Sequence, residues 1–306
     1  MLAPMTSSLT RRGWLRLALP VAGGLLLTGR SGFAASPHIA AFEDALAHLE
    51  RSSGGRLGVA LWQPATSLRA GHRLHQRFPM CSTFKVMLVA AVLHRADQAP
   101  DRADGHLDRR LHYTQAQVLS WAPVTSKHVA TGLTVRELCA AAITLSDNTA
   151  ANLLLASLGG PAAVTAYART LGDTRTRLDR TEPTLNSAIP GDPRDTTTPS
   201  AMAHNLDRLL LGNALSPASR RQLTAWMLDC QTGLHQLRAG LPAACKVADK
   251  TGNGSHGTSN DIAVLWPPHG APVIITAYLT QSTLTYSEQN AVLARVGRAA
   301  DECLRL

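Results

Sequence analysis

A serine and a lysine that could share a proton lie three residues apart in the segment Ser82-Thr83-Phe84-Lys85. The apolar run that follows, 86–93, predicts a buried helix beginning at about residue 83. Residues i and i+3 occupy the same face of a helix, so we expect the Ser82 hydroxyl to contact the Lys85 amine. An adjacent base is what turns a serine into a strong nucleophile.

The scarcity of lysine supports this interpretation, although a two-residue pattern can also arise by chance. The chain has four lysines and 26 arginines, and Lys85 alone has a serine three positions before it. Arginine cannot lose its proton in a protein, whereas lysine can. A lysine at position 85 therefore indicates a need for an amine that can release a proton.

Three further motifs carry polar side chains suited to catalysis. Ser146-Asp147-Asn148 precedes a predicted helix, where serine or aspartate is also an ordinary N-cap. Glu182-Pro183-Thr184-Leu185-Asn186 lies in a loop, and Lys250-Thr251-Gly252 ends a predicted strand. Each motif is a weak indication by itself.

The long loop from Arg180 to Pro199 has neither a helical nor a strand period and contains four prolines. Loops of this length in compact domains are usually functional or disordered. Arg180 and Asp195 stand at its two ends, and we expect them to pair. That pairing predicts an ordered Ω-type loop over 180–195.

Strand patterns lie near both ends of the mature chain, and helical patterns lie between them. Helices are predicted at 38–53, 83–95, 134–142, 148–158, 161–171, 199–212, 217–228 and 286–304, and strands at 57–62, 68–71, 246–250, 261–266 and 273–279. This order predicts an α/β plus all-α fold, in which an antiparallel sheet built from both termini is flanked by helices and a helical domain is inserted. We expect an α/β domain at 37–80 and 229–306, an all-α domain at 81–228, and a site between them.

Residues 1–35 have the layout of an export signal. A charged segment, 10–16, precedes the apolar run 17–27, and small residues favour cleavage near Ala35. The paired arginines resemble a twin-arginine signal, with an ordinary secretory leader as the alternative. The apolar run is too short to span a membrane. We therefore expect a periplasmic protein that is free of the membrane once its signal is removed.

The composition excludes several classes of partner. The net charge of +9 includes four leader arginines, so the mature chain carries +5. Its basic residues are scattered, and we expect no nucleic-acid partner. His72 and His75 form the one close histidine pair, without a partner motif, so no metal or cofactor is expected.

Together, the Ser-x-x-Lys, Ser-Asp-Asn and Lys-Thr-Gly motifs and the glutamate loop resemble the class A serine β-lactamases, over nearly the whole mature chain. That family belongs to the penicillin-recognising serine hydrolases. The resemblance implies a β-lactamase/transpeptidase-like fold and a hydrolase that opens the β-lactam amide bond, which gives antibiotic resistance. We expect a monomer whose partner is the β-lactam itself.

The resemblance implies a catalytic role for each motif. Ser82 attacks the β-lactam carbonyl to form an acyl-enzyme, and either Lys85 or Glu182 takes its proton. Ser146 passes a proton to the departing nitrogen. Glu182, with Asn186, activates the water that deacylates the enzyme, and the peptide bond after Glu182 is expected to be cis.

The substrate-binding residues are also implied by the resemblance. The backbone N–H groups of Ser82 and Asn253 form the oxyanion hole. Lys250 and Thr251 hold the substrate carboxylate, and Asn148 holds the acyl amide. The residues expected at the substrate site are Trp121, Asn148, Asn186, Lys250, Thr251, Gly252 and Asn253.

The chain departs from the family where an arginine usually helps to bind the substrate carboxylate. Alignment places Gln236, Ser259 and Gln289 at those positions, whereas Arg238 matches a structural arginine. Binding of the substrate carboxylate would then depend on Lys250, Thr251 and Ser259.

The cysteines do not match the disulfides of relatives. There are five, so at least one thiol is free. In some relatives a disulfide joins the cysteine before the nucleophile to a cysteine near position 253, but here alignment places Gly254 opposite Cys81. In others a disulfide lies in the helical domain, but here Val89 stands at the position of the partner of Cys139. We therefore expect neither disulfide.

Two alternatives to hydrolysis remain. A penicillin-sensitive D-alanyl-D-alanine peptidase shares the Ser-Lys chemistry but lacks the glutamate loop. A non-hydrolytic β-lactam sensor or cell-wall-binding module would keep Ser82 acylated or unreactive.

Overall fold

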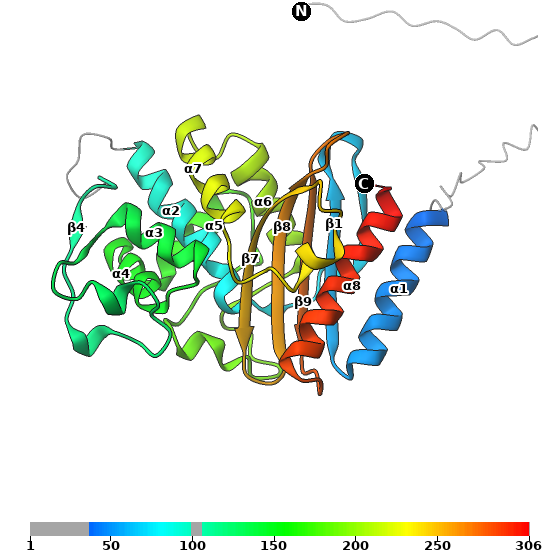
Figure 1. The fold of residues 1–306 in the computed structure, drawn as a ribbon, viewed down its shortest axis with the longest axis horizontal. Coiled ribbons are helices and arrows are strands. Elements are labelled where there is room, and N and C mark those ends of the chain that lie inside the picture. Colours follow the sequence, from blue (N-terminus) through cyan, green and yellow to red (C-terminus); the bar gives the residue numbers. More distant parts are fainter. Residues whose placement is uncertain (1–36, 99–105, 306) are drawn as a thin grey trace, which may run out of the picture. The chain divides into compact units, whose positions relative to one another are not determined.

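The computed structural model describes residues 37–98 and 106–305 (Figure 1). Its helices are α1 Pro37–Ser53, α2 Phe84–Gln98, α3 Val135–Thr144, α4 Asn148–Leu158, α5 Pro161–Thr170, α6 Pro199–Leu206, α7 Pro217–Leu228 and α8 Tyr286–Leu304. Its strands are β1 Arg56–Gln63, β2 Leu68–His72, β3 Phe78–Pro79, β4 Arg110–Leu111, β5 Leu133–Thr134, β6 Thr196–Thr197, β7 Lys246–Gly254, β8 Thr258–Trp266 and β9 Val273–Thr280.

The main sheet joins strands from the two ends of the chain, which confirms the predicted fold class. Its order is β2-β1-β9-β8-β7, and each neighbouring pair is antiparallel. β7 is therefore an edge strand, and its residues Lys250–Asn253 border the helical part of the chain.

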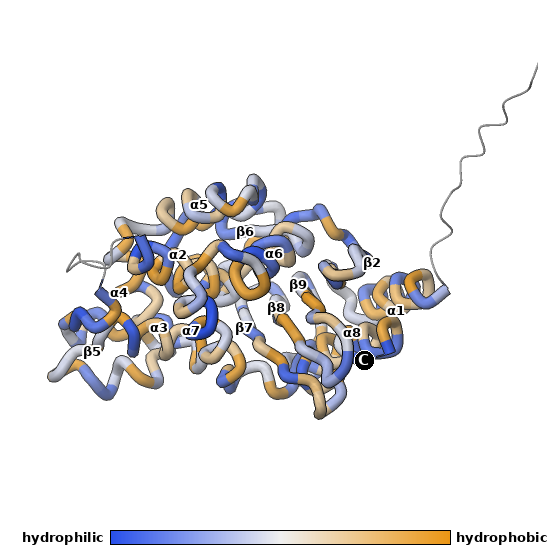
Figure 2. Tube along the Cα trace, turned by 90° about the horizontal axis from the view of Figure 1, so that it is seen from above, coloured by the Kyte–Doolittle hydropathy of each residue, from blue (hydrophilic) through white to orange (hydrophobic). Residues whose placement is uncertain are grey.

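Alternate residues of the strands pack against two different sets of helices. Leu57, Val59 and Leu61 of β1 join the cluster that includes α1 and α8, which lie side by side on one face of the sheet (Figure 1). Ala60, between them, faces the larger cluster formed with α2 to α7. Side chains alternate across a strand, so a strand covered on both faces is apolar throughout. The orange stretches of β8 and β9 in Figure 2 show this composition.

The helical segments agree with the sequence predictions, with two local differences. α2 begins at Phe84, because Cys81–Thr83 form a separate 3-10 turn that holds Ser82. The segment predicted as one helix over 199–212 is α6 followed by a π-helical turn, Asp207–Leu211. A π turn holds one more residue within each hydrogen-bonded ring than an α-helical turn. The spacing of the apolar residues changes little, so the sequence pattern did not distinguish the two.

The loop after Arg180 contains more regular structure than its sequence indicates. Thr184–Ser187 form a 3-10 turn. Strand β6 pairs with β3 through Thr196 opposite Pro79 and Thr197 opposite Phe78. Elements this short carry no measurable periodicity, so the prediction of an entirely irregular segment was wrong.

The predicted leader lies outside the described residues, as does the expected cleavage site. The described residues form one compact unit, so the predicted division at 81 and 228 stays a prediction. Among the described helices, none alone is long and apolar enough to cross a membrane, and α4 with α5 meets that test only as a pair bent by 72°.

Candidate active site

The Ser82 hydroxyl and the Lys85 amine are in contact, as their spacing predicts. Ser82 lies in the turn that leads into α2, and Lys85 Nζ donates to Ser82 Oγ at 2.9 Å. The residue before the nucleophile, Cys81, has a φ of 45°, and Ser146 has a φ of 57°. Left-handed backbone is uncommon for residues other than glycine and tends to cluster at active sites.

Lys85 is buried among oxygen atoms from three parts of the chain. Its Nζ donates to Asn148 Oδ1 at 2.6 Å and to the Ser146 carbonyl at 2.8 Å. It also forms an ion pair with Glu182 Oε1 at 3.0 Å. Burial lowers the pKa of Lys85, whereas the nearby Glu182 carboxylate opposes that change. The surrounding acceptors thus favour the charged form of Lys85 and offset part of the effect of burial.

Ser146 connects the two lysines. Its Oγ lies 3.3 Å from Lys85 Nζ and 3.0 Å from Lys250 Nζ. Burial lowers the pKa of Lys250 to about 8, and the positive charge of Lys85 contributes in the same direction. The two amines and the hydroxyl therefore form a continuous path for a proton.

Asp147 holds Ser146 and Asn148 in place from within the same motif. It caps α4 by accepting from the Ala150 N–H at 2.8 Å. The sequence allowed either Ser146 or Asp147 as the N-cap, and the structure shows that it is Asp147. It also accepts from the backbone N–H groups of Val124 and Thr125.

Glu182 points toward the nucleophile. Ser82 Oγ donates to Glu182 Oε1 at 3.2 Å, and Asn186 Nδ2 donates to Oε2 at 2.5 Å. The expected cis bond between Glu182 and Pro183 is present. Each carboxylate oxygen thus has a defined partner.

Asn152 of α4, which the sequence analysis missed, holds the backbone of Glu182. Its Nδ2 donates to the Glu182 carbonyl at 2.8 Å, and its Oδ1 accepts from the Glu182 N–H at 3.0 Å. An asparagine inside a helical pattern gives no indication of this role in the sequence.

The predicted Arg180–Asp195 ion pair closes the glutamate loop. Arg180 Nε donates to Asp195 Oδ2 at 2.5 Å. The buried Asp195 carboxylate also accepts from the N–H groups of Asp179 and Arg180, at 2.7 and 2.9 Å. Arg180 further donates to Ser187 Oγ at 3.0 Å, which ties the pair to the middle of the loop.

An open cleft of about 430 Å³ lies in front of these groups. Tyr286 and Thr232 line it and were missed by the sequence analysis; Thr232 Oγ1 lies 2.6 Å from Thr251 Oγ1. Trp121 is exposed at the cleft, and its indole N–H donates to the Leu145 carbonyl. Of the expected site residues, Ser82, Trp121, Ser146, Asn148, Asn186, Thr251, Gly252 and Asn253 line the cleft, and Lys85, Glu182 and Lys250 are buried beside it.

Gly252 brings the edge strand β7 against the nucleophile turn. A Cβ at this position would lie 2.9 Å from the Ser82 nitrogen and 2.7 Å from the Met80 carbonyl oxygen. Only glycine lets the strand approach the Ser82 N–H this closely.

Two amides and a hydroxyl lie together in the region that the alignment assigned to carboxylate binding. Gln236 Nε2 donates to Asn290 Oδ1 at 2.8 Å and to Ser259 Oγ at 3.3 Å. Ser259 donates to Asn253 Oδ1 at 3.1 Å. Gln289, which our alignment placed here, instead donates to the Leu284 carbonyl, so that assignment was wrong by one residue. The helical register of α8 sets which side chain turns toward the sheet.

All five cysteines are free thiols. The Cys81 Sγ would lie 2.6 Å from a Cβ placed on Gly254, which confirms that these positions face each other. Within the described residues, no group of three or more His, Cys, Asp or Glu side chains is arranged to hold a metal ion.

Comparison with known proteins identifies the family. The model of the β-lactamase enzyme family matches residues 41–304. The chain is 46% identical to β-lactamase OXY-1 of Klebsiella oxytoca over 96% of this chain and 99% of the relative. It is 51% identical to β-lactamase CTX-M-25 of Escherichia coli, over 83% and 86% of the two chains.

A solved structure of an ancestral (GNCA) class A β-lactamase superposes with a TM-score of 0.83 at 59% identity, covering 85% of this chain and 99% of that one. The chain belongs to the β-lactamase enzyme family, and its similarity is to the class A members.

Proposed function

We propose that this protein hydrolyses the amide bond of β-lactam antibiotics through an acyl-enzyme on Ser82, and so gives antibiotic resistance. The contact of Ser82 Oγ with both Lys85 Nζ, at 2.9 Å, and Glu182 Oε1, at 3.2 Å, is the observation that carries the proposal. It places the nucleophile in a solvent-accessible cleft, with an amine and a carboxylate buried directly behind it, either of which can take its proton according to the charge of Lys85.

Acylation begins when Ser82 attacks the β-lactam carbonyl. In the described geometry Lys85 donates to Ser82 Oγ, so Glu182 is the direct acceptor of the serine proton while Lys85 is charged. A neutral Lys85 would take that proton instead. The N–H groups of Ser82 and Asn253 stabilise the developing oxyanion. Ser146, bonded to Lys250, then protonates the leaving nitrogen and regains a proton from Glu182 through Lys85, which contacts both groups, so that Glu182 is again a carboxylate before deacylation.

Substrate is held by polar groups along the edge strand. The ammonium of Lys250 and the hydroxyl of Thr251 bind the carboxylate, and Ser259 contributes through Asn253. Asn148 binds the acyl amide, and Trp121 covers the cleft entrance.

Deacylation uses Glu182 as a general base. Its Oε2 is fixed by Asn186, and Oε1 faces the serine to which the acyl group is attached. A water held between Glu182 and Asn186 loses its proton to the carboxylate and attacks the ester. The Arg180–Asp195 pair keeps the loop in this position.

The test uses a chromogenic cephalosporin in excess over enzyme. We expect many turnovers per molecule. A single stoichiometric burst would indicate a peptidase or a sensor, and no reaction would indicate a binding module. The peptidase alternative is not favoured, because the chain carries the glutamate loop.

We infer that the protein acts as a monomer in the periplasm, with the 81–228 helical part and the remaining α/β part as its two lobes. The leader favours the twin-arginine route. Replacing Arg11 and Arg12 with lysines should leave the precursor in the cytoplasmic fraction if that route is used.

A further inference from the structure

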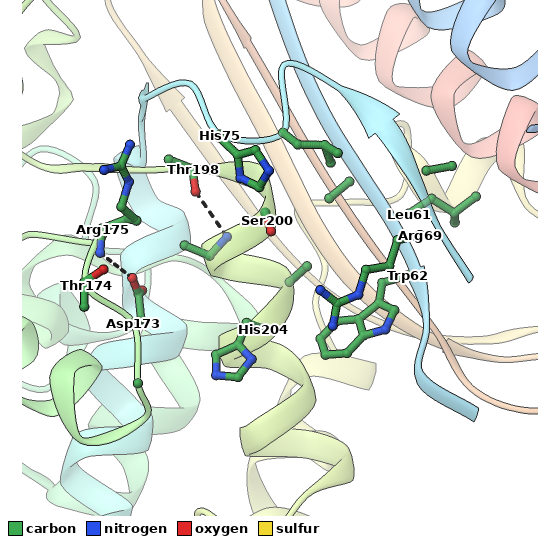
Figure 3. A pocket seen from close by; sticks show the side chains of 16 residues that line it. Leu61, Trp62, Arg69, His75, Asp173, Thr174, Arg175, Thr198, Ser200 and His204 are labelled. Atoms are coloured by element: carbon green, nitrogen blue, oxygen red, sulfur yellow. Dashed lines mark hydrogen bonds between the residues drawn. The ribbon is translucent and has the colours of Figure 1, made fainter. Parts of the chain in front are cut away.

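A second cavity, of about 390 Å³, lies away from the catalytic cleft and shares no lining residue with it. β1 and β2 bound it on one side, and residues 172–175 and 198–204 bound it on the other (Figure 3). These last two segments flank the loop that carries Glu182.

Aromatic side chains and an arginine form its walls. The Arg69 guanidinium lies 4.3 Å from the ring centroid of Trp62. The His204 ring is nearly parallel to Trp62, at 12°, with 6.4 Å between centroids. Figure 3 shows Trp62 and Arg69 on one side of the cavity, His204 on the other and His75 above them. His204 Nε2 donates to the Leu171 carbonyl at 2.9 Å, which leaves Nδ1 for a ligand.

The charges around the cavity favour an anion. The Arg69 and Arg175 side chains are exposed there, and neither makes a hydrogen bond or ion pair within the described part of the chain. The acid that lines the cavity, Asp173, is buried and already accepts from the Arg175 and Thr176 N–H groups and from Asn205. Asp207 is a second acid close to His204 and Arg69, and burial raises its pKa.

We propose that this cavity binds a small organic anion that carries a flat aromatic ring, such as an aryl carboxylate. Because Trp62 already stacks on His204 and carries Arg69 over its ring, the ligand ring packs against the edges of Trp62 and His204 in the edge-to-face arrangement that aromatic pairs also favour. The carboxylate accepts from the in-plane N–H groups of Arg69, which remain available while its guanidinium face rests on Trp62. The volume lies within the range of small-ligand sites.

Calorimetric titration of the full-length protein with naphthoate tests the proposal. We expect Arg69→Gln to weaken naphthoate binding about tenfold, the effect of losing one charge-assisted hydrogen bond. Arg51→Gln, which removes the same charge from an exposed position of α1, should leave binding unchanged. Trp62→Leu should weaken binding as well.

Two probes separate the ring from the charge. Naphthamide keeps the ring without the charge, and cyclohexanecarboxylate keeps the charge without the ring; both should bind more weakly than naphthoate. Naphthoate should leave the KM for a chromogenic cephalosporin unchanged. Binding that Arg69→Gln does not weaken, equal binding of either probe, or a competitive rise in KM that places the anion in the catalytic cleft would overturn the proposal.

Discussion

Lys85 and Glu182 form an ion pair that is completely shielded from solvent, with 3.0 Å between Nζ and Oε1. Ser82 Oγ contacts both members of the pair. A proton that leaves Ser82 can therefore move to either group without crossing solvent. The acylation base is therefore set by the position of one proton within this pair, and both members must be considered together.

Glu182→Ala removes the proposed base of deacylation while leaving the nucleophile in place. We expect deacylation to slow by about 10²- to 10⁴-fold, the usual contribution of a general base. Mass spectrometry should then detect a covalent adduct on Ser82 after mixing with a penicillin. Glu302→Ala, an exposed acid of α8, is the matched control. Rapid continued turnover of Glu182→Ala would remove this carboxylate from the mechanism.

The pKa of Lys250, lowered to about 8 chiefly by burial, predicts an alkaline limit to substrate capture. Below that pH the amine is charged and binds the substrate carboxylate; above it the amine is neutral. We expect kcat/KM to fall as the pH rises through about 8, because this ratio reports ionisations of the free enzyme. Lys250→Arg should move the fall to higher pH, since arginine keeps its charge. A profile that Lys250→Arg leaves unchanged would assign the alkaline limb to another group.

Asp195→Asn tests whether the loop closure supports deacylation. Removing one member of a buried ion pair costs about 3–5 kcal/mol of stability, and we expect the lower end of that range because Asp192, 3.7 Å from Arg180, remains as a counter-charge. We expect the deacylation rate to fall more than the acylation rate, because Glu182 lies in this loop. Asp108→Asn, which breaks the exposed Arg136–Asp108 pair at 3.1 Å, should change neither rate. Equal losses in both steps would argue against a specific role in deacylation.

Local spacing made part of the site predictable. The Ser82–Lys85 contact follows from helical geometry, and the Arg180–Asp195 pair follows from charges at the ends of one loop. The order of strand and helix patterns likewise gave the correct fold class. These features depend on short stretches of sequence or on the sequence of elements.

The unpredicted features depend on packing between distant elements. Asn152 contacts Glu182 because α4 packs against the glutamate loop. Thr232 contacts Thr251 because the segment that follows α7 lies beside β7. Neither residue belongs to a motif. Whether Gln289 or Asn290 points toward Gln236 depends on how α8 is rotated about its axis. Consecutive residues of a helix point in directions about 100° apart, so the sequence alone did not decide between them.

Asn152→Ala tests the positioning of Glu182 by α4. The change removes both hydrogen bonds to the Glu182 backbone and should lower stability by about 1–3 kcal/mol, the cost of leaving such groups unpaired. We expect slower deacylation with acylation nearly unchanged, measured by rapid mixing with a chromogenic cephalosporin. Asn213→Ala, at an exposed position, controls for the loss of an amide. A variant with lower stability but normal deacylation would reduce Asn152 to a purely structural residue.

Gly252→Ala tests the close approach of β7 to the nucleophile. The added methyl group would meet the Ser82 nitrogen at 2.9 Å and the Met80 carbonyl at 2.7 Å, both of them backbone atoms that cannot rotate away. The strand must therefore move outward, which carries the Asn253 N–H away from that of Ser82. Losing one oxyanion donor typically lowers kcat by about 10²- to 10³-fold, and we expect a loss of that order in acylation. Circular dichroism and thermal unfolding establish whether the variant is folded. A folded Gly252→Ala enzyme with an unchanged acylation rate would show that the oxyanion is stabilised elsewhere.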